Sequence, residues 1–116
     1  MDAEQYAELA LKTKLRKFAS AEEEIGYWAL CLAGEAGEVA NRAKKIWKHG
    51  HPLTKLEVTT MKDELGDVLW YLTVLAESMG VTLDDIMQHN LQKLNDRYPE
   101  GFSEERSINR DESHLR

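Results

Sequence analysis

The chain has 116 residues, 42% of them hydrophobic, which is the size and composition of one globular domain with a single core. Its 21 acidic residues outnumber 15 basic ones and give a net charge of −6, which argues against stable nucleic-acid binding because such surfaces are basic. The single cysteine excludes an internal disulfide, and we see neither a signal peptide nor an apolar run of about 20 residues, so we expect a cytoplasmic protein with no membrane span.

The first half of the chain predicts two helices. Asp2 can cap a helix that extends to about Phe18 and has one apolar side. Ser20 begins a capping box that opens a second, longer helix. This helix is expected to end near His49, because Gly50 can adopt the left-handed conformation that follows many helix ends.

The second half predicts two more helices. Thr54 opens another capping box, and the third helix is expected to stop at Gly80. The fourth helix starts at Thr82 and ends before Pro99, since proline cannot continue a helix. Each of the four carries apolar residues at helical spacing, so the fold class is all-α.

Residues 1–102 are therefore predicted to form one all-α domain, a four-helix bundle, followed by a polar and mobile tail over residues 103–116. Apolar residues surround the third helix, because Trp70 and Val74 lie outside its main apolar stripe. A homodimer or homotetramer that packs this helix against a partner chain would bury both sides. The alternative is that Trp70 packs under the first helix of its own chain.

Two acidic pairs at i, i+3 spacing are the most informative feature of the sequence: Glu35 with Glu38, and Glu64 with Asp67. Residues three apart share a helix face, and each pair borders the apolar stripe of its helix, where solvent screens the repulsion least. Two helices packed side by side would bring four carboxylates together. Such an all-oxygen set suits Mg²⁺, with Mn²⁺ as a substitute.

A solvated charge cluster is the alternative interpretation, in which Glu35 and Glu38 pair with Arg42 and Lys45 along their own helix. Two such motifs favour the metal site instead, because both lie at a core margin and both contain helical glycines that cost about 1 kcal/mol each. The sequence has no Glu-x-x-His for a di-iron bundle, no Gly-x-Ser-x-Gly and no glycine loop for phosphate.

Three segments around these motifs resemble the MazG-like all-α nucleoside triphosphate pyrophosphohydrolases: residues 32–39, 63–72 and 90–99. The resemblance covers about residues 25–102. It implies Mg²⁺-dependent hydrolysis of a nucleoside triphosphate, ribo or deoxy, to the monophosphate and pyrophosphate. The expected role is control or house-cleaning of the nucleotide pool.

The resemblance also implies roles for single residues. Glu35, Glu38, Glu64 and Asp67 match the metal-binding positions. Many members carry a further glutamate where this chain has Gly34. The general base is therefore open, and Glu38 is our candidate for accepting the proton of the attacking water.

Four residues at the end of the chain's last helix match positions near the substrate's phosphates and base: Asn90, Lys93, Arg97 and Tyr98. The alternative for each is an ordinary solvated helix end. Trp28 and Tyr71 are candidates for stacking on the nucleotide base, although core packing is the usual role of an aromatic residue at helical spacing.

Two other functions stay open at this point. A related all-α hydrolase would act on another nucleotide, such as dUTP or phosphoribosyl-ATP. A non-catalytic helical oligomer would use its acidic cluster to bind Ca²⁺ or a basic partner protein. Pyrophosphate release with Mg²⁺ separates the enzymes from the binding module, and a substrate panel separates one enzyme from the other.

Overall fold

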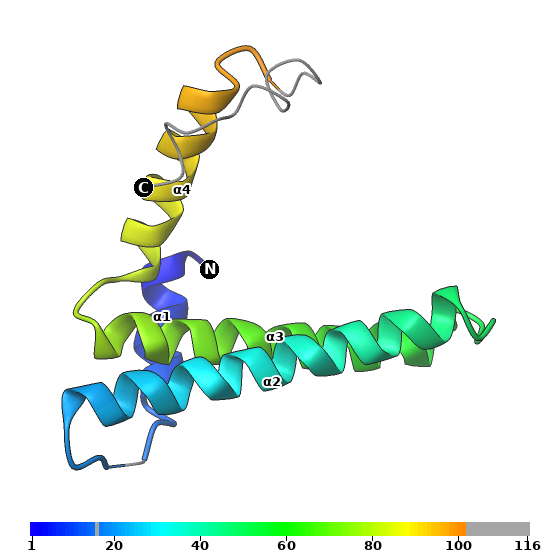
Figure 1. The fold of residues 1–116 in the computed structure, drawn as a ribbon, viewed down its shortest axis with the longest axis horizontal. Helices are drawn as coiled ribbons and strands as arrows, with labels where there is room; N and C mark the ends of the chain where they lie inside the picture. The colour runs from blue at the N-terminus through cyan, green and yellow to red at the C-terminus, as the bar shows by residue number, and fades with distance from the viewer. Residues whose placement is uncertain (16, 102–116) are drawn as a thin grey trace. The chain divides into compact units, whose positions relative to one another are not determined.

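The computed structural model describes residues 1–15 and 17–101, which form four α-helices (Figure 1). These are α1 (Ala3–Leu11), α2 (Ala21–Trp47), α3 (Lys55–Ser78) and α4 (Leu83–Arg97). The all-α prediction is confirmed, and the predicted tail over residues 103–116 lies outside the described residues. Within the described part of the chain, no helix combines the length and the apolar character that crossing a bilayer requires.

The chain divides into two compact units, one from Met1 to Thr82 and one from Leu83 onward. In the first unit, α2 and α3 lie side by side as a long antiparallel pair, and α1 packs across α3 (Figure 1). The short connection between α2 and α3 turns the chain back on itself. Residues far apart in the sequence therefore face each other across the pair, such as Arg42 with Glu57 near the connection and Trp28 with Trp70 at the opposite end.

The predicted starts and stops of α2 and α3 are confirmed by local hydrogen bonds and backbone angles. The hydroxyls of Ser20 and Thr54 each accept a bond from the backbone N–H three residues on, at 3.1 Å in both cases. Gly50 and Gly80, just beyond α2 and α3, have φ angles of +70° and +77°. This left-handed region is open to glycine and unfavourable for most other residues, so both helices stop where the glycines stand.

The first helix is shorter than predicted, since α1 ends at Leu11 and does not extend to Phe18. The backbone N–H groups of residues 12–14 bond to carbonyls three residues back, at 3.0 to 3.3 Å, which tightens the last turn. The Thr13 hydroxyl also donates to the Ala10 carbonyl at 2.7 Å. These bonds satisfy the carbonyls that a longer helix would have used, so the chain turns away.

Trp70 contacts α1 of its own chain, as the alternative to an oligomer contact predicts. Its indole N–H donates to Thr13 Oγ1 at 2.8 Å and to the Ala10 carbonyl at 3.3 Å, so Trp70 packs against α1 of its own chain. Val74 is fully buried, with 0% of its surface exposed. These two residues therefore give no reason to expect a homo-oligomer, because Val74 is buried within one chain and the half-buried Trp70 bonds to α1 of the same chain. A homodimer or homotetramer itself stays a prediction.

The core of the first unit is small and lies in the first half of α2, the second half of α3 and the end of α1. Trp28 is only 4% exposed, and the residues buried with it are mostly small: Ala10, Thr73, Val74 and Ala76. The far end of the helix pair is open by contrast, since Trp47 and Leu56 are 77% and 75% exposed. The acidic motifs lie between these two regions.

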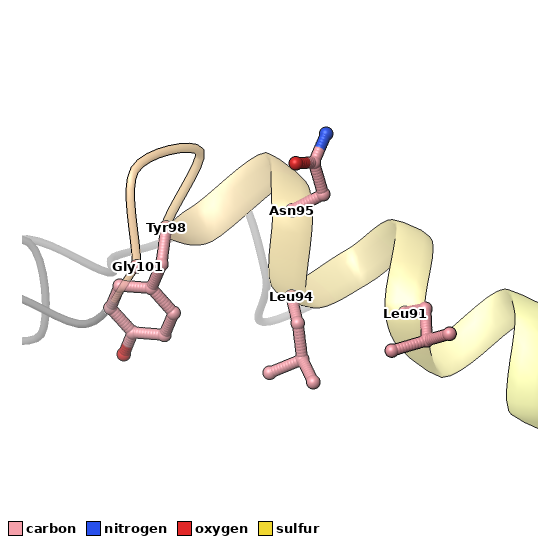
Figure 2. A pocket seen from close by; sticks show the side chains of 5 residues that line it. All are labelled: Leu91, Leu94, Asn95, Tyr98 and Gly101. Carbon is pink, nitrogen blue, oxygen red and sulfur yellow. The ribbon is translucent and has the colours of Figure 1, made fainter.

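The second unit contains α4 and the turn that follows it. Leu91, Leu94 and Tyr98 extend from the same side of α4, and together with Asn95 and Gly101 they line a pocket of about 490 Å³ (Figure 2). The Tyr98 N–H donates to the Leu94 carbonyl at 2.8 Å and holds the end of the helix. Tyr98 therefore lines an apolar hollow of this unit and is half-buried.

Candidate metal centre

Three of the four predicted metal ligands meet between α2 and α3. Glu35 from α2 and Glu64 and Asp67 from α3 each offer a carboxylate oxygen, and the three oxygens lie within 4.8 Å of one another. Glu35 and Glu64 are partly buried, whereas Asp67 is exposed. The antiparallel packing of the two helices produces this meeting, because it places the middle of α2 against the middle of α3.

Glu38 lies outside this group. It is exposed on α2, one turn beyond Glu35. A residue three positions along a helix is rotated by about 60° from the first, and this rotation turns Glu38 toward solvent. Its charge still contributes, as the weakest of several causes, to raising the pKa of Glu35. Its roles as a ligand and as the general base stay predictions.

The electrostatics of the group centre on Glu35. Burial is the largest cause that raises the pKa of its carboxyl above the usual range, followed by a hydrogen bond with Glu64 and the negative charge of Asp67. One carboxyl must keep a proton for two carboxyl groups to share a hydrogen bond. Glu35 therefore resists ionisation unless a positive charge joins the group.

The donor set fits a hard divalent cation. The Oε2 atom of Glu35 is buried and has no hydrogen-bond partner, which is costly for an acceptor removed from water. Oxygens on opposite sides of a Mg²⁺ ion lie about 4.2 Å apart, twice the usual Mg–O distance of about 2.1 Å. Three oxygens that lie within 4.8 Å of one another are therefore close enough for one ion to contact all of them. Exposed Asp67 leaves one side open, as Mg²⁺ sites that keep water or substrate oxygens require.

Arg42 pairs across the helices and not along its own helix as the alternative interpretation held. Its Nη1 lies 3.6 Å from Glu57 Oε1, and its Nε lies 3.8 Å from Glu64 Oε1. Neither Glu35 nor Glu38 forms an ion pair with another described residue, and the same holds for Lys45. The alternative interpretation, in which basic residues of α2 neutralise the α2 pair, is therefore not supported.

Tyr6 is a neighbour of the site that sequence reasoning did not find. Burial raises the pKa of its phenol, and the negative charge of Asp67 raises it further, so α1 brings this hydroxyl close to the acidic group. Tyr71 is affected similarly: burial raises its pKa most, with smaller contributions from Cys31, Glu35 and other nearby groups. The pattern of α1 showed only an apolar side, and the position of that side against α3 depends on tertiary packing.

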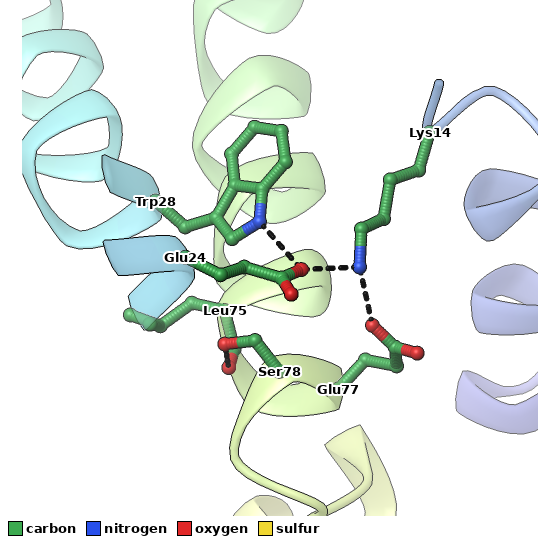
Figure 3. Close-up of polar contacts among 6 residues, drawn as sticks. All are labelled: Lys14, Glu24, Trp28, Leu75, Glu77 and Ser78. Atoms are coloured by element: carbon green, nitrogen blue, oxygen red, sulfur yellow. Dashed lines mark hydrogen bonds and ion pairs between the residues drawn. The ribbon is translucent and has the colours of Figure 1, made fainter. Parts of the chain in front are cut away.

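Trp28 belongs to the core. Its indole N–H donates to Glu24 Oε2 at 3.0 Å, and its ring packs edge-on against Trp70 with centroids 5.6 Å apart. The same Glu24 carboxylate pairs with Lys14, which also donates to Glu77 Oε2 at 2.8 Å (Figure 3). With 4% of its surface exposed, Trp28 has no free ring face for a nucleotide base. The core alternative is thus supported for Trp28, while Tyr71, half-buried beside the acidic group, remains a candidate.

The pKa of Lys14 reflects this network. Burial would lower it, but the hydrogen bonds and charges of Glu24 and Glu77 outweigh burial and raise the pKa. The pKa of Glu24 is lowered, first by its bond with Lys14 and then by its bond with Trp28. The segment after α1 is therefore tied to both long helices near the core.

The predicted substrate-binding residues of the last helix belong to the second unit. Asn90 and Lys93 are exposed on α4, and Arg97 and Tyr98 are half-buried at its end. All four share the second unit, so the structure brings them together along one helix and its end. Their roles toward a substrate stay predictions.

Comparison with known proteins gives two matches. The family model of the MazG nucleotide pyrophosphohydrolase domain matches residues 27–102. This range includes all of α4 and the three carboxylates of the acidic group. The Gene 37 protein of Mycobacterium phage L5 is 38% identical over 89 residues, covering 76% of this chain and 78% of that protein. No solved structure gave a significant match.

Proposed function

This chain belongs to the MazG nucleotide pyrophosphohydrolase family, and we propose that it hydrolyses a nucleoside triphosphate to the monophosphate and pyrophosphate with Mg²⁺ at its acidic group. The observation that carries the proposal is the meeting of Glu35, Glu64 and Asp67 from two helices, with a buried carboxylate oxygen that lacks a hydrogen-bond donor. A structural role would not need three acids at one point. Their mutual repulsion destabilises the folded chain unless a cation joins them.

The ion, when bound, would neutralise phosphate charge and lower the pKa of a coordinated water. Glu35, Glu64 and Asp67 would hold it, with Mn²⁺ as a substitute. Glu38 is exposed beside the group and is not among the three that meet, so it is our candidate for accepting a proton from water. Gly34 carries no side chain that could take this role.

Four residues of the second unit are assigned to the substrate. We assign Lys93 and Arg97 to the phosphates, because charge-assisted bonds from basic side chains are the usual partners of phosphate oxygens. Asn90 and Tyr98 are assigned to the neighbourhood of the base and sugar, and Tyr71 to stacking on the base. The physiological role that follows is control of the nucleotide pool, including the removal of unwanted triphosphates.

A pyrophosphate-release screen over the common ribo- and deoxynucleoside triphosphates, dUTP, phosphoribosyl-ATP and oxidised nucleotides tests the proposal, with and without Mg²⁺. We expect release that depends on Mg²⁺ and is abolished in Asp67→Asn. The matched control is Asp63→Asn, which removes the same charge from an exposed position of α3 outside the group. No release from any of these substrates would favour a non-catalytic cation-binding protein, and equal activity in the two variants would remove Asp67 from the site.

We also propose that the chain forms a homodimer or homotetramer. The support comes from large apolar side chains left on the surface of the helix pair, where Leu30, Leu65 and Leu69 are 77%, 52% and 40% exposed. Light scattering tests this, and a mass near the 13.3 kDa of one chain at micromolar concentration would contradict it.

A further inference from the structure

Arg42 is a charged residue of the helix pair to which the proposed chemistry gives no role. It lies on α2 and faces two acids of α3, with Nη1 3.6 Å from Glu57 and Nε 3.8 Å from Glu64. The side chain is 33% exposed and both acids are 20% exposed, so water screens these pairs only in part. Glu64 is also one of the three carboxylates that meet at the acidic group.

The contacts of Arg42 are ion pairs without hydrogen bonds. Both distances exceed the usual hydrogen-bond range, and the buried Nε has no hydrogen-bond partner among the described residues. Arginine normally forms a planar two-pronged bond with a single carboxylate, which fixes that carboxylate in place. Here the guanidinium stands between two carboxylates and bonds to neither. Its effect on Glu64 is therefore mainly that of a positive charge, which it cannot lose because arginine stays protonated.

Glu64 thus has two competing positive partners, Arg42 and the divalent cation of the proposed site. The other two acids of the group, Glu35 and Asp67, offer Glu64 no positive charge. Arg42 offsets part of the repulsion among the three acids in the cation-free chain. A cation that arrives at the group must overcome the repulsion of the nearby guanidinium.

We propose that Arg42 is a built-in counter-ion of Glu64, which stabilises the cation-free acidic group and lowers its affinity for a divalent cation. The inference rests on the proposed metal site and adds a residue that sets how strongly this site binds. Glu57 competes for the same guanidinium, because its Oε1 lies 3.6 Å from Arg42 Nη1. The consequence is a site that binds a free cation loosely. A cation that arrives bound to a nucleotide is repelled less, because the negative phosphates are attracted by Arg42.

Titration calorimetry with MnCl₂ or MgCl₂, without nucleotide, tests the inference in Arg42→Gln. We expect cation binding to become about tenfold tighter, which corresponds to about 1.4 kcal/mol. The matched control is Lys44→Gln, which removes the same charge from an exposed position on α2 that forms no ion pair with a described residue. Its affinity should change by less than about twofold. Arg42→Lys keeps the charge and should bind within about threefold of the parent.

Thermal unfolding gives a second readout. Without cation, Arg42→Gln should unfold at a lower temperature than the parent, because the acids lose their counter-ion. With saturating cation, this difference should shrink or reverse, because the tighter ligand stabilises the variant more.

The direction of the change decides the question, since general damage to the fold would weaken cation binding. Equal or weaker binding by Arg42→Gln, or an equal gain in Lys44→Gln, would overturn the inference. So would a lysine variant that binds as tightly as the glutamine variant. If the parent itself bound no cation, the proposed metal site would fail first, and this inference would fall with it.

Discussion

Replacing Glu35 by glutamine should stabilise the protein in the absence of metal. The change keeps the size of the side chain and removes the one carboxyl of the acidic group whose pKa is raised by burial, by its bond with Glu64 and by the charge of Asp67. The amide of glutamine can still donate a hydrogen bond to Glu64, as the protonated carboxyl does. The variant therefore separates the cost of the charge from the contribution of packing.

The size of the effect follows from proton linkage. In the unfolded chain, Glu35 ionises near its ordinary pKa of 4.5, while in the folded chain it keeps its proton to a higher pH. Between these two values the folded state binds one more proton than the unfolded state. The free energy of unfolding of the parent therefore falls by about 1.4 kcal/mol per pH unit until the folded pKa is passed. The glutamine variant lacks this fall, and the difference between the two proteins reaches its maximum above the pKa of Glu35 in the folded chain.

Urea unfolding with EDTA, at a series of pH values between 4 and 8, measures this difference. Subtracting the parent from the variant largely cancels the other acids, which titrate in both proteins. We expect the difference to be smallest near pH 4, to grow in favour of Glu35→Gln through the window above pH 4.5, and then to level off. Each 1 kcal/mol corresponds to roughly 4 °C in Tm for a domain of this size.

Adding saturating Mg²⁺ should reverse the order of stability. The parent gains about 2.7 kcal/mol when the free ion reaches about one hundred times its Kd, whereas the variant, which lacks one ligand, gains less. Parallel stability curves from pH 4 to 8 in EDTA would refute the electrostatic reasoning. A variant that is less stable than the parent at pH 8 would refute it as well.

Three further outcomes are expected. Trp70→Phe removes the indole bonds to α1 and should lower the free energy of unfolding in urea by about 1–2 kcal/mol, whereas Trp47→Phe, at a 77% exposed position, should change it by less than about 0.5 kcal/mol; equal losses would contradict the assigned role of Trp70. Lys14→Met should cost about 1 kcal/mol at neutral pH, and because the raised pKa of Lys14 means that its contribution is lost at high pH, the deficit should close above pH 10.5; a deficit that stays constant there would exclude the ion pairs as its cause. Lys93→Ala should weaken the binding of a non-hydrolysable triphosphate in saturating Mg²⁺ by ten- to a hundredfold, with the affinity for Mg²⁺ alone unchanged, and equal nucleotide binding in calorimetry would remove Lys93 from the site.

Local sequence determined where α2 and α3 start and stop. Ser20, Thr54, Gly50 and Gly80 act through hydrogen bonds and backbone angles that involve only their close neighbours in the chain. Such signals do not depend on the rest of the fold, so they could be predicted. The same holds for the pairing of acids within each helix, since i, i+3 geometry is a property of the helix itself.

The end of α1 could not be predicted in this way. The apolar pattern continues toward Phe18, but the helix stops at Leu11, where the chain bonds back to its own carbonyls and meets Trp70 of α3. A contact with a residue nearly sixty positions away has no local signature. The same contact places Trp70 against α1 of its own chain. Trp70 therefore gives no reason to expect an oligomer.

The acidic site depends both on local sequence and on tertiary packing. The sequence alone determined which acids share a helix face, and so it identified Glu35, Glu64 and Asp67 as candidates. Only the tertiary structure decided which acids meet, because the alignment of α2 against α3 places Glu35 beside Glu64 and leaves Glu38 exposed. It also decided that Arg42 faces Glu64 across the helices, since a long side chain pairs with whatever the packing places opposite it. Periodicity determines the face of one helix, and the register between two helices depends on the whole core.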